Sequence, residues 1–396
     1  MSSRAAPRPS LPAAPRCTQA VILVGGEGKR LRPITSRTPK PVTPLVERPF
    51  IAYILDNLVR HGVERAIFSS GYLAEAIEAA IGDGSAYGLR VDYVREAEPL
   101  GTAGAIANCA DVLDDGPLFV FNGDVLSDVD LTAMAAAHAA RRGAATICLT
   151  EVEEPSRYGL VLLNEDHLVA EFIEKPSTWL GPALINAGVY VLDREVLDLV
   201  PRGVEFSIER GVFPRLAGDE ALYGFTDAGY WRDIGTPESY LQAHFDVLAG
   251  AVRTVVGEQL DGHGRFVAPT AAIAPEARLV APVYVGDGAV IEAGARVGPR
   301  CVLGAGACVR AGARVSESVI QADGVIGAHA EIERSVLVRG ARIGAGARVT
   351  DAVLGEACEV GVGERPAAGI RLYPREGVAD GALVLEGSSS SQRRND

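Results

Sequence analysis

Two hydrophobic patterns divide this chain into two parts. From Gln19 to about Gly250, short apolar runs alternate with segments whose apolar residues recur at helical spacing. Ala20–Val24 is a short β-branched run ended by glycines, which is typical of a buried strand. After Pro49, apolar residues at positions 51, 54, 55 and 58 form one stripe, which predicts a helix.

The same alternation continues through the first part. It predicts strands at Ala66–Ser69, Val91–Val94 and Leu118–Phe121, and helices at Leu73–Ile81, Ala103–Leu113 and Leu131–Arg142. Alternating strands and helices indicate a mostly parallel sheet whose ligand crevice lies at the carboxyl ends of the strands. Beyond Thr146 the segments become shorter and more strand-like. We therefore expect a Rossmann-like mixed sheet of the α/β class.

From Val267 onward, aliphatic residues recur every six residues, and small residues, usually alanine, fill the fourth place after most of them. A six-residue period predicts a left-handed parallel β-helix of hexapeptide repeats, triangular in section, with three hexads in each of about five coils. The aliphatic series is Val267, Ile273, Leu279, Val285, Ile291, Val297, Leu303, Val309 and Val315, then, after slips of one residue, Ile320, Ile326, Ile332 and Val338, then Ile343 and Val349, and then Leu354 and Val360.

These patterns suggest domain boundaries. We expect a disordered tail at 1–18, an α/β domain at 19–250, a linker at 251–264, the β-helix at 265–375 and a C-terminal tail at 376–396. The first sixteen residues are rich in proline, alanine and arginine and lack an apolar core, which favours a tail over a signal peptide.

Composition excludes several classes of partner. The 396 residues carry a net charge of −13, which disfavours nucleic acids and acidic membranes. No apolar run reaches the roughly 18 residues of a membrane span. Six cysteines without a C-x-x-C pair indicate reduced thiols. We expect a cytoplasmic protein that binds neither nucleic acid nor membrane.

Lysine is rare and concentrated. The chain has 38 Lys and Arg residues but only three lysines, Lys29, Lys40 and Lys175. A lysine retained in such a chain suggests a position whose function requires a compact, flexible ammonium group rather than a planar guanidinium. The alternative is that lysine was replaced by arginine through genetic drift and that these three are random survivors. Two of the three lie with Arg30, Arg32 and Arg37 in one basic segment, which favours an anionic small molecule.

The segment opens with a glycine-rich turn. Gly25, Gly26 and Gly28 follow the first predicted strand and can present backbone N–H groups to a phosphate. The spacing is neither a Walker A motif nor G-x-G-x-x-G, because Leu31 occupies the third glycine position. Arg30 and Lys40, which follow, could hold a triphosphate.

An ordered set of motifs resembles the sugar-nucleotide pyrophosphorylases, nucleotidyltransferases that act on sugar 1-phosphates. Within this family, L-V-G-G, S-I-E-R-x-V-F-P and F-N-G-D-V most resemble bacterial mannose-1-phosphate guanylyltransferases. The motifs are V-G-G-E-G-K-R-L-R-P (24–33), T-P-K-P (38–41), P-L-G-T-A-G (99–104), F-N-G-D (121–124), R-Y-G (157–159), E-K-P (174–176), I-N-A-G (185–188) and W-R-D-I-G-T-P (231–237), followed by the β-helix.

The resemblance implies an in-line attack of a sugar 1-phosphate on the α-phosphorus of a nucleoside triphosphate, with Mg²⁺ bound by Asp124 and Asp233. The alternatives are a turn-forming Asp124 and an Asp233 that caps a helix near Pro237. Arg30, Lys40 and Lys175 are the implied catalytic residues; a solvated surface charge is the alternative for Lys175. The implied nucleotide-binding residues are Val24, Gly25, Gly26, Gly28, Lys29, Glu96, Gly101 and Thr102, and the implied sugar-phosphate-binding residues are Gly159, Glu174, Lys175 and Asn186.

Glu96 is the candidate reader of the base. A carboxylate can accept two hydrogen bonds from guanine N1–H and the 2-amino group, which indicates GTP; a solvent-facing acid competing with Glu98 is the alternative.

Lys29 departs from the family, which usually has threonine there. The expected product is GDP-mannose, and the same reaction with glucose 1-phosphate and dTTP, UTP or ATP is the first rival.

A non-catalytic subunit that senses a nucleotide sugar is the second rival, but it would be expected to lack Arg30, Lys40, Asp124 or Asp233.

The resemblance allows the β-helix to be an acyltransferase, a regulatory platform or an oligomer interface. Acyltransferases of this architecture use a histidine base, and His329 has no partner motif, so we expect a surface histidine. We favour assembly into a homo-oligomer.

Overall fold

The computed structural model describes residues 17–71, 73–141, 143–179, 181–379 and 382–384, which fall into two compact units. Most of both predicted tails lies outside these residues. Of the described residues, the first unit contains 17–21, Leu100–Phe121 and Asp130–Asp227. The second unit contains those in Ile22–Pro99 and Asn122–Val129 and those from Ala228 to Val384.

The first unit is built on a mixed sheet, as expected. Its strands follow the order β10-β9-β11-β6-β1, and β8 pairs with β11 and β12. Strand β11 is antiparallel to β6, β8 and β9, whereas β12 is parallel to β8. The strands are β1 (Gln19–Leu23), β6 (Leu118–Asn122), β8 (Ala145–Val152), β9 (Gly159–Leu163), β10 (Val169–Glu174), β11 (Ala183–Leu192) and β12 (Leu222–Thr226).

In the described residues of this unit, three α-helices accompany these strands: α3 (Gly101–Asn108), α4 (Leu131–Ala140) and α5 (Phe213–Gly218). Asp130 begins α4 because its carboxylate accepts the Ala133 N–H at 2.9 Å. Helix α3 is shorter than the predicted Ala103–Leu113, since the backbone continues after Cys109 as a 3₁₀ turn. Arg142, the predicted last residue of α4, lies outside the described residues.

The second unit begins with the end of β1 and contains β4 (Arg65–Ser70) parallel to β5 (Arg90–Arg95). Helix α1 (Phe50–Arg60) buries the predicted stripe, with Ile51, Leu55 and Leu58 fully covered. The other helices are α2 (Ala74–Ile81), α6 (Pro237–Leu248) and α7 (Val255–Gln259), and the short paired strands are β2 (Pro44–Leu45) with β3 (Arg48–Pro49) and β7 (Val125–Ser127) with β13 (Trp231–Asp233). None of the helices in the described chain has the length and apolar character needed to cross a membrane.

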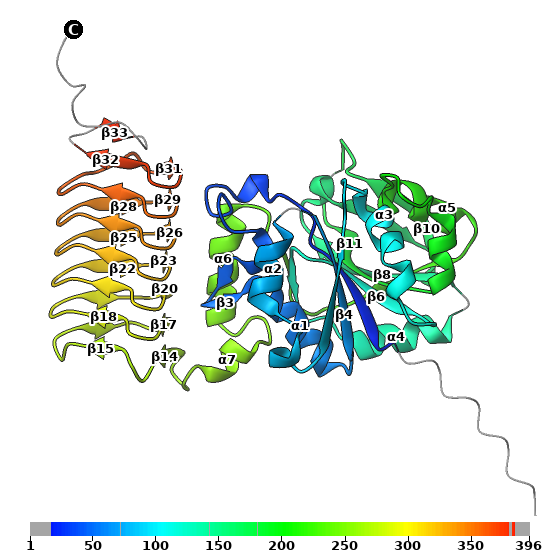
Figure 1. Cartoon of the computed structure of the whole chain (residues 1–396), viewed down its shortest axis with the longest axis horizontal. Coiled ribbons are helices and arrows are strands. Elements are labelled where there is room, and N and C mark those ends of the chain that lie inside the picture. The colour runs from blue at the N-terminus through cyan, green and yellow to red at the C-terminus, as the bar shows by residue number, and fades with distance from the viewer. Residues whose placement is uncertain (1–16, 72, 142, 180, 380–381, 385–396) are drawn as a thin grey trace, which may run out of the picture. The chain divides into compact units, whose positions relative to one another are not determined.

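The rest of the second unit is a parallel β-helix whose strands stack as successive coils (Figure 1). Its three sheets account for the six-residue period. The first sheet contains β14 (Arg265–Val267), β17 (Val283–Val285), β20 (Cys301–Leu303), β23 (Val319–Ile320), β26 (Val336–Leu337), β29 (Val353–Leu354) and β31 (Arg371–Leu372). The second contains β15 (Ala272–Ile273), β18 (Val290–Ile291), β21 (Cys308–Val309), β24 (Val325–Ile326), β27 (Arg342–Ile343), β30 (Glu359–Val360), β32 (Gly377–Ala379) and β33 (Ala382–Val384). The third contains β16 (Arg278–Leu279), β19 (Arg296–Val297), β22 (Arg314–Ser316), β25 (Glu331–Glu333) and β28 (Arg348–Thr350).

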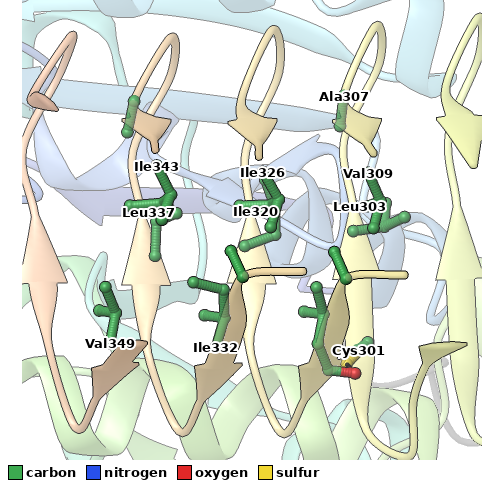
Figure 2. Close-up of a cluster of buried hydrophobic side chains, with 14 of the residues drawn as sticks. Cys301, Leu303, Ala307, Val309, Ile320, Ile326, Ile332, Leu337, Ile343 and Val349 are labelled. Carbon is green, nitrogen blue, oxygen red and sulfur yellow. Dashed lines mark hydrogen bonds between the residues drawn. The ribbon is translucent and has the colours of Figure 1, made fainter. Parts of the chain in front are cut away.

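The inward side chains form aligned rows, such as Leu303, Ile320 and Leu337 (Figure 2). Two expectations were wrong in detail. The inward residue of β26 is Leu337, not Val338, because these coils contain 17 residues and Ile320 pairs with Leu337. Val267 does follow the series, since it pairs in register with the inward Val285, but it is 40% exposed because the first coil has a neighbouring coil on one side only. The first sheet has seven strands, so the estimate of about five coils was low.

One outer face of the β-helix is also apolar. Val302, Val319, Val336 and Val353 point outward from the first sheet and are buried in one cluster with residues of α1 and α6. Alternate residues of the strands in this sheet therefore pack into two different hydrophobic cores, one inside the coils and one against the helices outside. This face is covered within the chain itself.

Candidate active site

The two predicted metal ligands, Asp124 and Asp233, come together because their short strands pair. Asp124 precedes β7, and Asp233 ends β13 opposite Val125. The Ile234 N–H donates to the Asp124 carbonyl at 3.0 Å. Gly123 allows this turn to lie against β1, since a Cβ there would come within 2.6 Å of the Leu23 carbonyl oxygen.

Lys40 lies between these two carboxylates. Its Nζ is 3.0 Å from Asp124 Oδ2 and 3.9 Å from Asp233 Oδ1, and the residue is only 8% exposed. Burial raises the pKa of Asp233, and the Asp124 carboxylate raises it further, whereas Lys40 and Arg30 lower it. The Arg30 guanidinium lies near the Asp233 carboxylate, because both groups border Gly235. A Cβ on Gly235 would lie 2.9 Å from Asp233 Oδ2 and 3.2 Å from Arg30 Nη2.

The alternatives for the two aspartates can be compared with this geometry. Asp124 does lie in a turn, but its side chain also pairs with Lys40. Asp233 does not cap α6; Thr236 does, with its hydroxyl accepting the Ser239 N–H at 3.2 Å. Among the residues that the structure describes, no group of three or more His, Cys, Asp and Glu side chains could hold a metal. A cation here would draw its remaining ligands from substrate and water.

The glycine turn lies beside this cluster. Gly28 has φ +60°, and a Cβ there would lie 3.3 Å from the Lys40 Cβ. The Thr35 hydroxyl donates to the Gly28 carbonyl at 2.8 Å, which holds the turn against Lys40. Gly25 and Gly26 are exposed, so a ligand can approach their backbone. Lys29 is also exposed and pairs with Glu27 at 3.0 Å.

Glu96 follows β5 and lies against the same turn. Its Oε1 accepts the Ser69 hydroxyl at 3.1 Å, and a Cβ on Gly25 would be 3.1 Å from that oxygen. Glu96 is half-buried, whereas Glu98 is exposed. Val24 is buried, and its N–H donates to the Ser69 carbonyl at 2.9 Å, which fixes the start of the turn.

The first unit brings together most of the residues predicted to bind the sugar phosphate. Gly159 on β9 pairs with Glu174 on β10, and a Cβ on Gly159 would lie 3.1 Å from Glu174 Oε2. Lys175 is exposed and pairs with Glu174 at 3.2 Å. Asn186 on β11 donates from Nδ2 to the Tyr190 hydroxyl at 3.0 Å.

Thr102 makes contacts that the sequence did not predict. Its hydroxyl donates to Glu209 Oε2 at 2.8 Å and accepts the Ile208 N–H at 2.8 Å. Gly101 has φ +69°, and a Cβ there would lie 2.9 Å from the Phe206 carbonyl oxygen. Thr102 therefore holds the segment that starts the short π-helix at Ile208–Val212. Glu209 was not among the predicted site residues, and its place in the S-I-E-R motif (207–210) was the only feature of the sequence that could have pointed to it.

Comparisons with known proteins identify the family. Residues 19–250 match the model of the nucleotidyl transferase family, and residues 266–365 match the GMPPB C-terminal domain. The chain belongs to the nucleotidyl transferase family, which confirms the resemblance noted in its motifs.

Two relatives share most of this chain. It is 43% identical over 288 residues to mannose-1-phosphate guanylyltransferase of Mycobacterium tuberculosis, covering 70% of this chain and 77% of the relative. It is 36% identical over 290 residues to mannose-1-phosphate guanylyltransferase 1 of Arabidopsis thaliana, covering 70% and 79%. The crystal structure of HddC from Yersinia pseudotuberculosis complexed with GMP-PN is similar at TM-score 0.50 and 30% identity, covering 57% of this chain and 98% of that one.

Proposed function

We propose that this protein is a mannose-1-phosphate guanylyltransferase, which transfers GMP from GTP to mannose 1-phosphate and releases pyrophosphate. The observation that carries the proposal is the buried Lys40 held between Asp124 and Asp233 beside an exposed glycine turn. The relatives at 36–43% identity that carry this name support the choice of substrates.

The reaction joins two anions, so its main requirement is to hold them together and neutralise charge. A phosphate oxygen of mannose 1-phosphate forms a bond to the α-phosphorus of GTP. The bond from that phosphorus to the β-phosphate bridging oxygen breaks, and pyrophosphate leaves with the electron pair. Lys40 and Arg30 stabilise the negative charge that develops on the α-phosphate and the leaving group.

Asp124 and Asp233 fit a Mg²⁺ ion. They are two carboxylates close enough for Asp124 to raise the pKa of Asp233, and a divalent cation would relieve that repulsion. When bound, the ion supplies positive charge to the phosphate oxygens of the nucleotide. Lys40 supplies the positive charge between the two carboxylates in the free protein.

The other site residues divide between the two substrates. Glu96 would accept hydrogen bonds from guanine, because one of its oxygens is already oriented by Ser69 against the glycine turn. Lys175 would bind the sugar phosphate, and Glu174, Asn186 and the backbone of Gly159 would contact the sugar. The enzyme would act in the cytoplasm as a homo-oligomer.

The test is pyrophosphate release by the full chain with Mg²⁺ and a panel of nucleoside triphosphates and sugar 1-phosphates. We expect GTP with mannose 1-phosphate to give the highest kcat/KM. A higher value for glucose 1-phosphate with dTTP, UTP or ATP would replace the assigned substrates. Binding of GDP-mannose without turnover of any pair would favour the sensor subunit instead.

A further inference from the structure

The β2–β3 hairpin has an unusual turn. Both turn residues, Val46 and Glu47, have positive φ, at 43° and 67°. Two-residue hairpins of this kind normally use Asn-Gly or Asp-Gly, because the left-handed region is costly for other residues and most of all for β-branched ones. A Val-Glu pair does not favour this turn by itself. Contacts from elsewhere must hold it, and such outliers often mark functional positions.

Two contacts hold the turn. Val46 is fully buried, and its N–H donates to His244 Nδ1 on α6 at 3.2 Å. Burial lowers the pKa of His244 to about 3, so the ring stays neutral and Nδ1 can accept. The Glu47 carboxylate accepts the N–H of Ala305, in the β-helix, at 2.7 Å.

Two glycines of the β-helix lie beside the Glu47 carboxylate. Gly286 and Gly304 are at the corners of two successive coils. A Cβ on Gly286 would lie 3.1 Å from Glu47 Oε2, and a Cβ on Gly304 would lie 2.6 Å from Glu47 Oε1. The same Cβ atoms would also come within 3.0 Å of the Ala305 N and 2.6 Å of the Ala322 N, so the close stacking of the coils requires glycine at these corners as well. Glu47 lies in the space that these glycines leave, and the Ala305 backbone N–H supplies the donor.

The hairpin is also continuous with the catalytic cluster. Lys40 lies four residues before Pro44, and its carbonyl accepts the Thr43 N–H at 3.1 Å. The Tyr240 hydroxyl donates to the Pro44 carbonyl and accepts from Gln321 Nε2 of the β-helix at 3.1 Å. Tyr240 lies on α6, which begins just after Asp233.

We propose that Glu47 is a positioning residue for Lys40. Its hydrogen bond to Ala305 holds the strained Val46–Glu47 turn, and the turn holds Lys40 between Asp124 and Asp233. The β-helix thereby supports the chemistry of the α/β part without touching the reactants. As it concerns catalysis, the inference rests on the proposed function; as it concerns the position of Lys40, it can be tested separately.

The first test uses amine acylation of the full chain without substrates, followed by mass spectrometry. Because the chain has only three lysines, the exposed Lys29 and Lys175 are internal references for the buried Lys40. Glu47→Ala should raise the acylation rate of Lys40 by about fivefold relative to those references, since local opening governs access to a buried group. Glu47→Gln, whose amide oxygen can still accept from Ala305, should stay near the wild-type rate.

The matched control is Glu292→Ala. Glu292 also accepts a backbone N–H of the β-helix, that of Ala311 at 3.0 Å, but the bond lies within the β-helix itself. This variant should leave Lys40 acylation unchanged. An unchanged Lys40 rate in Glu47→Ala, or an equal rise in Glu292→Ala, would overturn the proposal.

The second test is kinetic. Glu47→Ala should lower kcat by about tenfold with a smaller change in KM, because misplaced catalytic groups affect the reacting state most. Glu47→Gln should restore most of kcat, whereas equal loss in both variants contradicts a role through the Ala305 hydrogen bond. If the wild type turns over no substrate pair, the proposed function fails, and the acylation test still decides the position of Lys40.

Discussion

The Lys40 ion pairs of the α/β part and two arginine ion pairs of the β-helix differ in burial, and this difference distinguishes a candidate site from an ordinary charged surface. Lys40, whose side chain is 10% exposed, lies between two carboxylates. On the β-helix, Arg334 pairs with Asp351 and Arg348 pairs with Glu331, with arginine side chains 42% and 53% exposed. Exposed pairs contribute little to stability, so the second group is a solvated surface, whereas a buried lysine with two acids indicates a site.

The largest effect should come from the buried cluster. Lys40→Met should lower kcat by about 10²- to 10³-fold, because a charge fixed at the reacting phosphates is lost. The melting temperature should also fall, because the repulsion between Asp124 and Asp233 is no longer relieved. Initial rates of pyrophosphate release measure the first effect, and Arg348→Met is the control that should retain full activity. A Lys40→Met enzyme of normal kcat would remove Lys40 from catalysis.

The core of the β-helix should show the next largest effect, on stability. Leu337→Ala should lower the free energy of unfolding by about 2–5 kcal/mol, because it leaves a cavity between the coils. Val267→Ala, at the exposed first coil, should cost much less. Calorimetry of both variants measures this difference. Equal costs would mean that the first coil is as tightly packed as the centre.

Base recognition should give a moderate effect within the α/β part. Glu96→Gln should lower kcat/KM for GTP by about tenfold, because an amide cannot accept both guanine hydrogen bonds, while kcat/KM for ATP changes little. Competition between GTP and ATP at fixed Mg²⁺ measures the ratio. If the preference for GTP persists, another residue recognises the base.

The smallest effect should come from the exposed ion pairs. Arg334→Ala should leave the free energy of unfolding almost unchanged, because the pair with Asp351 is screened by water. Activity should stay at the wild-type level. Thermal melts at low and high salt measure the change. A large loss would show that the charged corners hold the coils together.

The repeat was predictable because it is local. Each inward position of the β-helix recurs in the sequence, so the six-residue period alone indicated the three sheets. The assignment of Val338 instead of Leu337 failed because both residues are aliphatic and a coil of 17 residues shifts the register by one. The outward valines were not singled out, since an outward apolar row becomes a core only when α6 covers it.

The sequence by itself determined the fold class, the family and the chemical types of the site residues, because periodicity and ordered motifs depend on neighbours along the chain. Only the tertiary structure decided that Lys40 contacts Asp124 and Asp233, residues far apart in sequence that meet through the β7–β13 pair. It also decided the place of Glu47, whose left-handed turn opposes its local preference and exists because the β-helix supplies a hydrogen-bond donor. Burial and contacts between residues far apart in sequence determine the position of Lys40 and the conformation of Glu47, and the local sequence pattern predicts neither of them.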